Sequence, residues 1–210
     1  MIYYLYTGIL LLMSSWVVWR FYSQRHVLPC PSWLAWMVEL DNPFAKAHKA
    51  TEIIRFLSLR PGMKILDIGC GPGRICVPLA EKIDAIGGHV TGLDIQSDMI
   101  EKAREKSEKL GLLNIDFICG TIDQLPDNTY YNSMLMVCVL GEIPATEHAK
   151  VLEKMSSHLV PEGIISVTET VFDPHFQRHA KVKKLMKNNG FAEIKYRGNW
   201  LAYTAHFRKE

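Results

Sequence analysis

Short apolar segments alternate with amphipathic segments along most of this chain, and this alternation limits the folds it can adopt. Between residues 63 and 190 the pattern predicts five strands, over 63–69, 89–95, 115–120, 133–140 and 163–169. Helices are predicted over 75–83, 97–111, 145–159 and 176–190. Strands and helices that take turns along a chain are typical of a parallel sheet covered by helices on both faces.

The two ends of this alternating region complete the predicted sheet. A helix is expected over 41–59, because a capping Asp41 or Asn42 and an early Pro43 precede a helical repeat of apolar residues. After residue 190, apolar segments over 191–197 and 200–207 flank the short turn Gly198-Asn199 and predict a hairpin. We therefore expect an α/β fold with a doubly wound, mostly parallel sheet and an antiparallel hairpin at its C-terminal edge.

The first twenty residues carry no charged side chain until Arg20. As a helix, residues 2–19 would span roughly 27 Å, which is close to the thickness of the hydrocarbon core of a bilayer. No basic region precedes the apolar run, which disfavours a secretory signal, and Arg20 and Arg25 after it favour a cytoplasmic remainder. We predict a transmembrane or membrane-anchoring helix over 1–20, an interfacial linker over 21–40 and one domain over 41–210. A helix lying in the membrane plane, or one buried in the domain, is the alternative.

Charge and cysteine usage exclude several other classes. Lys and Arg number 24 against 22 Asp and Glu, so the overall charge gives no reason to expect a nucleic-acid partner. The 5 cysteines form no C-x-x-C pair and have no zinc-like spacing with the histidines. Their odd number is also unlike a closed disulfide framework, so we expect no metal site and a reducing, cytoplasmic setting.

The segment "LDIGCGPGR", residues 66–74, places three glycines directly after a predicted strand. Glycines allow positive φ and a close approach of a ligand to the backbone, and the helix that follows offers free N–H groups. A dinucleotide fingerprint starting at Gly69 would need a glycine where Arg74 stands, and the Gly-Lys-Ser or Gly-Lys-Thr of a P-loop is absent. These two common phosphate-binding loops therefore do not fit.

The spacing D-x-G-x-G-x-G from Asp67 to Gly73 resembles the glycine loop of the class I S-adenosylmethionine-dependent methyltransferases. The resemblance runs from about Pro43 to the C-terminus and implies a Rossmann-like domain that binds S-adenosyl-L-methionine. It implies that the loop contacts the methionine part and ribose of this cofactor. The residues concerned are Asp67, Gly69, Cys70, Gly71 and Gly73.

Three further segments carry the same resemblance. In "HVTGLDIQSD" it implies that Asp94 accepts hydrogen bonds from both ribose hydroxyls and that Ile95 lines the adenine site. In "CGTIDQLP" the acid that family members place near the adenine amino group is replaced by Thr121, followed by Ile122, with Asp123 close by. In "VCVLGEIP" it implies that the cofactor is lined by Val139 and Leu140 and that the reacting methyl group is faced by Glu142.

Methyl transfer is an in-line displacement that depends mostly on alignment, so the sequence need not contain a catalytic triad. We name Glu142 and His175 as candidate catalytic residues, with Glu169, Asp173 and Tyr130 also expected around the site. A helix-capping or solvated role is the alternative for His175.

The style of the second motif resembles that of the quinone-biosynthesis C-methyltransferases and nearby small-molecule and lipid methyltransferases. Together with the predicted anchor, this favours a small lipid, quinone-like or thiol acceptor and a single-pass membrane protein with its domain in the cytoplasm. The alternative is a membrane-bound S-adenosylmethionine-binding protein without turnover, serving as a sensor or assembly factor. A nicotinamide-dependent oxidoreductase is disfavoured by Arg74.

Overall fold

The computed structural model describes residues 46–210, together with the isolated positions 6, 8 and 14. The predicted membrane helix over 1–20, the linker over 21–40 and the beginning of the helix over 41–59 therefore lie outside the described residues. Within the part that is described, no helix combines the length and apolar character that crossing a bilayer requires.

The described residues form strands and helices close to the predicted ranges. The strands are β1 (Lys64–Ile68), β2 (His89–Asp94), β3 (Ile115–Cys119), β4 (Tyr131–Val137), β5 (Leu159–Thr170), β6 (Phe191–Gly198) and β7 (Ala202–Lys209). The α-helices are α3 (Ala50–Phe56), α4 (Cys76–Asp84), α5 (Ser97–Lys109), α6 (His148–Ser157) and α7 (His179–Asn188). Short 3₁₀ helices are η2 (Lys46–His48), η3 (Ile122–Gln124) and η4 (Leu140–Glu142).

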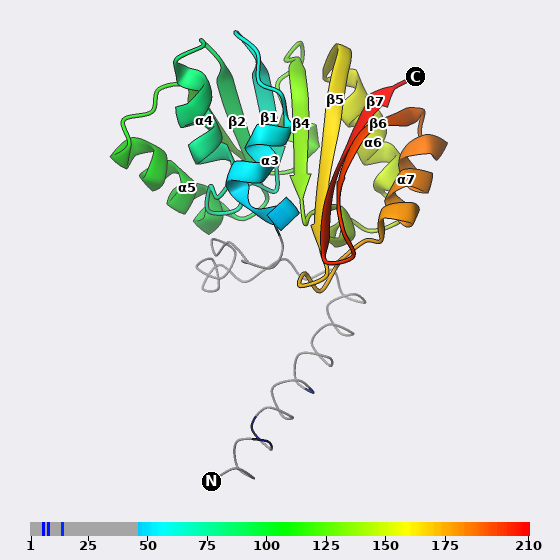
Figure 1. Cartoon of the computed structure of the whole chain (residues 1–210). Coiled ribbons are helices and arrows are strands. Elements are labelled where there is room, and N and C mark those ends of the chain that lie inside the picture. The colour runs from blue at the N-terminus through cyan, green and yellow to red at the C-terminus, as the bar shows by residue number, and fades with distance from the viewer. Residues whose placement is uncertain (1–5, 7, 9–13, 15–45) are drawn as a thin grey trace.

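The strands form one sheet in the order β3-β2-β1-β4-β5-β7-β6 (Figure 1). From β3 to β5 all neighbours are parallel, whereas β7 runs antiparallel to both β5 and β6. The predicted α/β class and the antiparallel C-terminal hairpin are therefore confirmed. The strand order reverses between β1 and β4, which places a topological switch point at their carboxyl ends.

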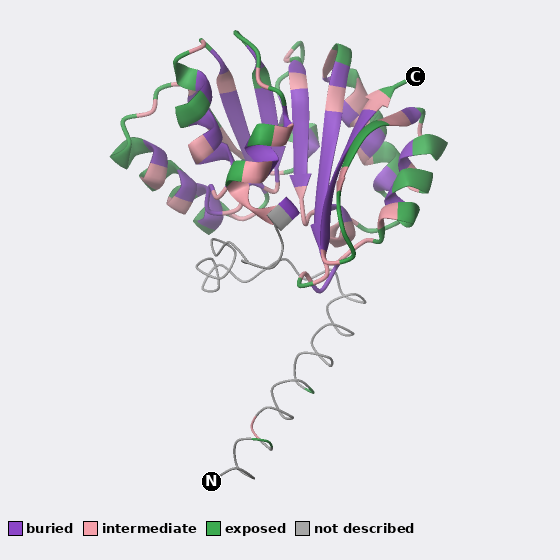
Figure 2. Ribbon diagram, in the orientation of Figure 1, coloured by how far each residue is buried: buried purple, intermediate pink, exposed green. Residues whose placement is uncertain are grey.

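Helices cover both faces of the sheet, and the side chains of the central strands divide between two cores. On β1, Leu66 packs into the core that contains residues of α6 and α7, whereas the adjacent Ile65 packs into the core that contains residues of α3, α4 and α5. Met134 and Leu135 of β4 divide in the same way. Burial on both faces explains why these strands are apolar at nearly every position, as Figure 2 shows along the centre of the sheet.

The hairpin that closes the sheet differs in detail from the prediction. The strand expected to begin at Trp200 begins at Ala202, so Trp200 lies in the turn and is 79% exposed. The side chain of Asn199 accepts hydrogen bonds from the N–H groups of Leu201 and Ala202, which stabilises this turn. Because the Asn199 side chain occupies backbone N–H groups that strand pairing would otherwise use, β7 begins at Ala202 and not at Trp200.

Candidate functional site

The glycine loop after β1 adopts backbone angles that favour glycine. Gly69, Gly71 and Gly73 have φ values of 66°, 52° and 84°. A Cβ added at Gly69 would lie 2.3 Å from Cγ2 of Val139, so a side chain there would collide with the segment after β4. The Gly69 N–H donates to the Leu93 carbonyl at 2.7 Å, which ties the loop to the end of β2. The loop is thereby held between the ends of β2 and β4.

Asp94 is the last residue of β2 and is only 8% exposed. Its Oδ2 accepts from the Gly71 N–H at 2.8 Å and its Oδ1 accepts from the Gln96 N–H at 2.9 Å. Burial raises the pKa of this carboxyl, while the N–H donors act in the opposite direction. Each carboxylate oxygen can accept a further hydrogen bond, so Asp94 can hold two additional hydroxyl donors.

A cavity of about 340 Å³ opens in front of Asp94, at the carboxyl ends of β1, β2 and β4. The loops after β3 and β5 complete its walls. Among the predicted site residues, those that line it are Gly69, Gly71, Asp94, Ile95, Thr121, Ile122, Val139, Glu142 and Asp173. Residues of the same lining that the sequence analysis did not name include Pro72, Gln96, Met99, Cys138, Ile143, Glu147 and Lys150. Since this cavity coincides with the switch point of the sheet, it lies where open α/β sheets bind ligands.

Most of the charged side chains that line this cavity are acidic. Its carboxylates are Asp94, Asp123, Glu142, Glu147 and Asp173, and among the lining residues they face a single cation, Lys150. Lys150 lies 3.6 Å from Asp123 Oδ2. Excess negative charge in a partly buried cavity favours a ligand that carries positive charge.

Comparison with known proteins identifies the family. Residues 59–206 match the model of a methyltransferase domain. The chain belongs to the methyltransferase-domain family.

Relatives and solved structures agree with this assignment. An arsenite methyltransferase of Halobacterium salinarum is 32% identical over 117 residues, which cover 55% of this chain and 29% of that protein. A demethylmenaquinone methyltransferase of Listeria welshimeri is 31% identical over 121 residues, which cover 57% of this chain and 50% of that protein. The chain thus spans half or less of the length of these curated relatives.

A solved S-adenosylmethionine-dependent methyltransferase from Aquifex aeolicus superposes with a TM-score of 0.73 at 19% identity, covering 85% of this chain and 98% of that one. At this identity the superposition establishes the fold. Together with the family match, it confirms the prediction of an S-adenosylmethionine-dependent methyltransferase domain and its cofactor.

Four of the residues predicted to bind the cofactor do not line the cavity of the methyltransferase domain. Asp67 is 1% exposed, and its carboxyl receives the Cys76 N–H at the start of α4. Burial and the nearby Asp94 charge raise the pKa of Asp67 to about 7. The other three, Cys70, Gly73 and Leu140, do not line the cavity either. Cys70 and Leu140 are buried in the two cores, and a Cβ on Gly73 would lie 2.7 Å from Val77 Cγ2.

Thr121 lines the cavity, but its hydroxyl is already engaged. It caps η3, because its Oγ1 donates to Gln124 Oε1 at 2.8 Å and accepts from the Asp123 N–H at 3.4 Å. Asp123 lines the same cavity with a half-exposed carboxylate. For an amino group in this part of the cavity, Asp123 is therefore the stronger acceptor.

Two acidic side chains from different loops line the cavity, and each lies within 4 Å of His175 Nδ1. Glu142 ends η4 and Asp173 follows β5, and both line the cavity. Burial raises the pKa of Glu142 to about 8, with smaller contributions from the negative charges of Asp173 and Asp94. Glu142 therefore holds its proton at neutral pH.

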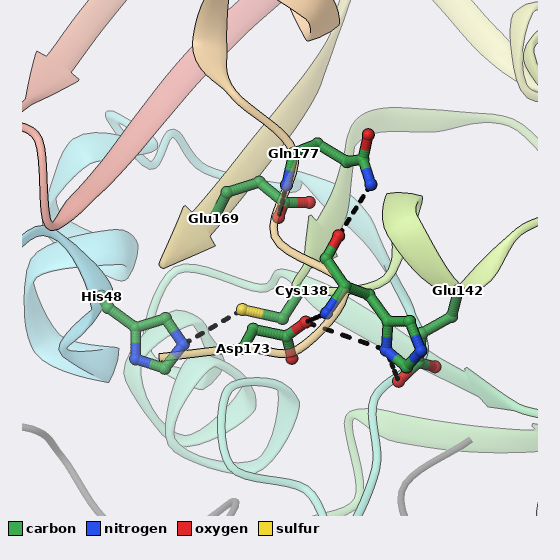
Figure 3. A network of polar contacts seen from close by, with 7 residues as sticks. His48, Cys138, Glu142, Glu169, Asp173 and Gln177 are labelled. Atoms are coloured by element: carbon green, nitrogen blue, oxygen red, sulfur yellow. Dashed lines mark hydrogen bonds and ion pairs between the residues drawn. The ribbon is translucent and has the colours of Figure 1, made fainter. Parts of the chain in front are cut away.

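His175 lies behind this acidic pair and does not line the cavity. It is 3% exposed, and its Nδ1 is 3.8 Å from Glu142 Oε1 and 3.9 Å from Asp173 Oδ1 (Figure 3). Its backbone N–H donates to Asp173 Oδ1 at 2.7 Å. The structure thus brings the two predicted catalytic residues together, with Glu142 at the cavity and His175 in the supporting position.

The loop that carries Asp173 packs closely against η4. A Cβ on Gly141 would lie 2.0 Å from the His175 carbonyl oxygen, so this approach requires a glycine. The Gln177 N–H donates to Glu169 Oε2 at 3.0 Å, and Gln177 Nε2 donates to the His175 carbonyl at 2.7 Å. Glu169 is 1% exposed and burial raises its pKa well above the ordinary value, so it braces this loop.

A thiol and an imidazole meet at the end of β4. Cys138 lines the cavity with a φ of 60°, and its Sγ lies 3.5 Å from His48 Nε2 of η2. Burial raises the pKa of this thiol well above its usual value, and the negative charges of Asp173 and Glu169 raise it further. Arg74 of the glycine loop donates to the His48 carbonyl and holds η2 in place.

Tyr130, which the sequence analysis expected near the site, lies outside the cavity. It precedes β4 and therefore stands at the amino ends of the parallel strands, opposite the cavity. Its place in the sequence, directly before an apolar strand, could have indicated this position.

Proposed function

We propose that this methyltransferase domain transfers a methyl group from S-adenosyl-L-methionine to a small, amphipathic acceptor at a membrane. The observation that carries this proposal is the position of Asp94, which faces a cavity at the switch point of the sheet while it holds the glycine loop by the Gly71 N–H at 2.8 Å. This arrangement suits a ligand with paired hydroxyl groups and a positive charge.

The described residues fit the cofactor. When bound, S-adenosylmethionine supplies an electrophilic methyl group on a positively charged sulfur. Asp94 has free acceptor capacity for two ribose hydroxyls, and Asp123 offers a carboxylate for an amino group. The surplus of acidic side chains in the lining favours this cationic ligand over its neutral product.

At the other end of the cavity, Glu142 and Asp173 can manage the proton of the acceptor. The pKa of Glu142, raised to about 8 by burial and by the nearby charge of Asp173, favours the protonated form of Glu142 at neutral pH. In its ionised form Glu142 can accept a proton from an acceptor hydroxyl, thiol or activated carbon, and in its protonated form it can donate a hydrogen bond to a polar acceptor group. The Nδ1 atom of His175 lies 3.8 Å from Glu142 Oε1 and 3.9 Å from Asp173 Oδ1, next to both carboxyl groups.

An amphipathic acceptor is supported by two independent observations. One relative named above is a demethylmenaquinone methyltransferase, and its name denotes a quinone acceptor. In addition, residues 2–19 carry no charge and are long enough to reach roughly across a bilayer core as a helix. We propose that this segment anchors the protein and that the domain faces the cytoplasm.

Incubation of the purified full-length protein with S-adenosylmethionine labelled on its methyl group, in the presence of a total membrane extract, tests this proposal. We expect label in a lipid or quinone fraction for the wild type and much less for Asp94→Ala. Binding of the cofactor without transfer to any fraction would instead favour a sensor or assembly factor that does not turn over.

A further inference from the structure

A second cavity lies at the same edge of the sheet and has not been assigned to any ligand. It measures about 790 Å³ and is formed by the loop after β5, the start of α7 and the β6–β7 turn. The Val171 N–H donates to the Leu201 carbonyl at 2.9 Å, which joins the loop to the turn, and Figure 1 shows both segments below the carboxyl end of β5. We call this cavity the aromatic cleft, because four of its lining residues are Phe176, Tyr196, Trp200 and Tyr203.

The rings of the aromatic cleft are arranged around one another. The Tyr196 and Tyr203 rings lie 6.2 Å apart at an angle of 24°, and the Phe176 ring meets Tyr203 edge-on at 6.4 Å. Tyr203 is buried, and its hydroxyl donates to the Gln177 carbonyl at 2.8 Å, which fixes the floor of the cleft. In contrast, Tyr196 is 44% exposed and Trp200 is 79% exposed. These two rings leave a large apolar area in water that a planar ligand would cover.

The cleft also has a positive side. Arg178 and His179 line it, and they stand at the beginning of α7, where the helix dipole favours an anion. The first turn of α7 contains no acidic residue. The carboxylate of Glu193 beside it is engaged by His179 Nε2 at 2.5 Å and by Lys183 Nζ at 2.9 Å. A ligand in the aromatic cleft therefore meets rings on one side and positive charge on another.

One loop contributes residues to both the aromatic cleft and the cofactor cavity. The loop after β5 places Asp173 in the cofactor cavity, and it places Val171 and Phe176 in the aromatic cleft. From these contacts we propose that the aromatic cleft is the acceptor subsite, which binds an aromatic ring system bearing a carboxylate or phenolate. This inference rests on the proposed methyl transfer and specifies its acceptor.

Binding of 2-naphthoate to the full-length protein, saturated with S-adenosylhomocysteine and followed by calorimetry, tests the inference. Because an exposed ring that stacks on a ligand contributes on the order of 1 kcal/mol, Trp200→Ala should weaken binding about fivefold to tenfold. Trp200 lies in an exposed turn, so this change should leave the fold intact. The matched control is Tyr130→Ala, which removes a ring that is 49% exposed at the opposite edge of the sheet and should leave the affinity unchanged.

Arg178→Gln tests the positive side separately. It should weaken the binding of 2-naphthoate about tenfold, as expected for one charge-assisted hydrogen bond, and should leave the binding of neutral 2-naphthalenemethanol unchanged. Equal losses for both probes, or an affinity for 2-naphthoate that Trp200→Ala does not change, would overturn the proposal. The proposal is also overturned if 2-naphthoate does not bind and Trp200→Ala releases the protein from phosphatidylglycerol vesicles. In that case the exposed rings bind the bilayer surface and not an acceptor.

Titration with S-adenosylhomocysteine distinguishes a failure of the acceptor subsite from a failure of the proposed function. The wild type and Trp200→Ala should bind it with equal affinity, because Trp200 does not line the cofactor cavity. If S-adenosylhomocysteine binds and 2-naphthoate does not, the acceptor subsite alone is refuted. If S-adenosylhomocysteine itself does not bind, the proposed methyl transfer fails first.

Discussion

Replacing Asp94 should separate ligand binding from stability. In the folded protein its carboxylate accepts the N–H groups of Gly71 and Gln96 and has acceptor capacity left for two hydroxyl groups of a ligand. Hydrogen bonds to a charged group are worth roughly 1.5–3 kcal/mol each, and about 1.4 kcal/mol corresponds to tenfold in Kd. We therefore expect Asp94→Ala to weaken the binding of S-adenosylhomocysteine at least about tenfold.

The effect of Asp94→Ala on stability should be much smaller. Because burial raises the folded-state pKa of Asp94, its ionised form destabilises the folded state at neutral pH. Removing the carboxylate relieves this cost while it breaks the two hydrogen bonds to the loop. Since the two effects oppose each other, we expect the free energy of unfolding to change by about 1 kcal/mol, or roughly 2–4 °C in Tm.

Calorimetric titration of S-adenosylhomocysteine and thermal unfolding measure these two quantities on the same preparations. Asp127→Ala is the matched control, because it removes an exposed carboxylate that does not line the cavity and should leave both quantities unchanged. An unchanged affinity of Asp94→Ala would refute the role of this carboxylate. A fall in affinity that accompanies unfolding of the protein would show that Asp94 acts through the fold.

Other changes test the remaining parts of the site. Gly69→Ala should lower Tm and weaken S-adenosylhomocysteine binding, because it combines a φ of 66° with a Cβ 2.3 Å from Val139 Cγ2; a stable variant with full affinity would contradict this. Burial raises the pKa of Glu142 from 4.5 to about 8. The wild type should therefore lose stability relative to Glu142→Gln as the pH rises from 4.5 to about 8, and the difference should stay constant at higher pH. Denaturant unfolding of both proteins at a series of pH values measures this difference. A pH-independent difference would show that Glu142 is not perturbed. Removing residues 1–25 should release the protein from membranes and leave S-adenosylhomocysteine affinity unchanged, and a full-length protein that dissolves without detergent would contradict the anchor.

Local patterns in the sequence were sufficient for most of the fold. Strands buried on both faces are largely apolar runs, and glycine or an acid marks the ends of the first two, at Gly69 after β1 and at Asp94 in β2. The position of Asp94 at the cavity follows from this rule together with parallel pairing. Tyr130 was misplaced because it precedes β4, and Trp200 was assigned to a strand because the side-chain hydrogen bonds of Asn199 could not be foreseen from an apolar run.

The rest of the site depends on contacts between segments that are distant in sequence. Cys138 meets His48 across 90 residues, and Asp173 reaches Glu142 only because Gly141 lets the loop after β5 approach η4. The raised pKa of Glu142 also depends on distant segments, since the charges of Asp173 and Asp94 add to the effect of burial. The Glu142 carboxyl and the neighbouring aromatic cleft are thus both shaped by one loop, which is why a change in this loop should alter acceptor choice while Asp94 continues to hold the cofactor.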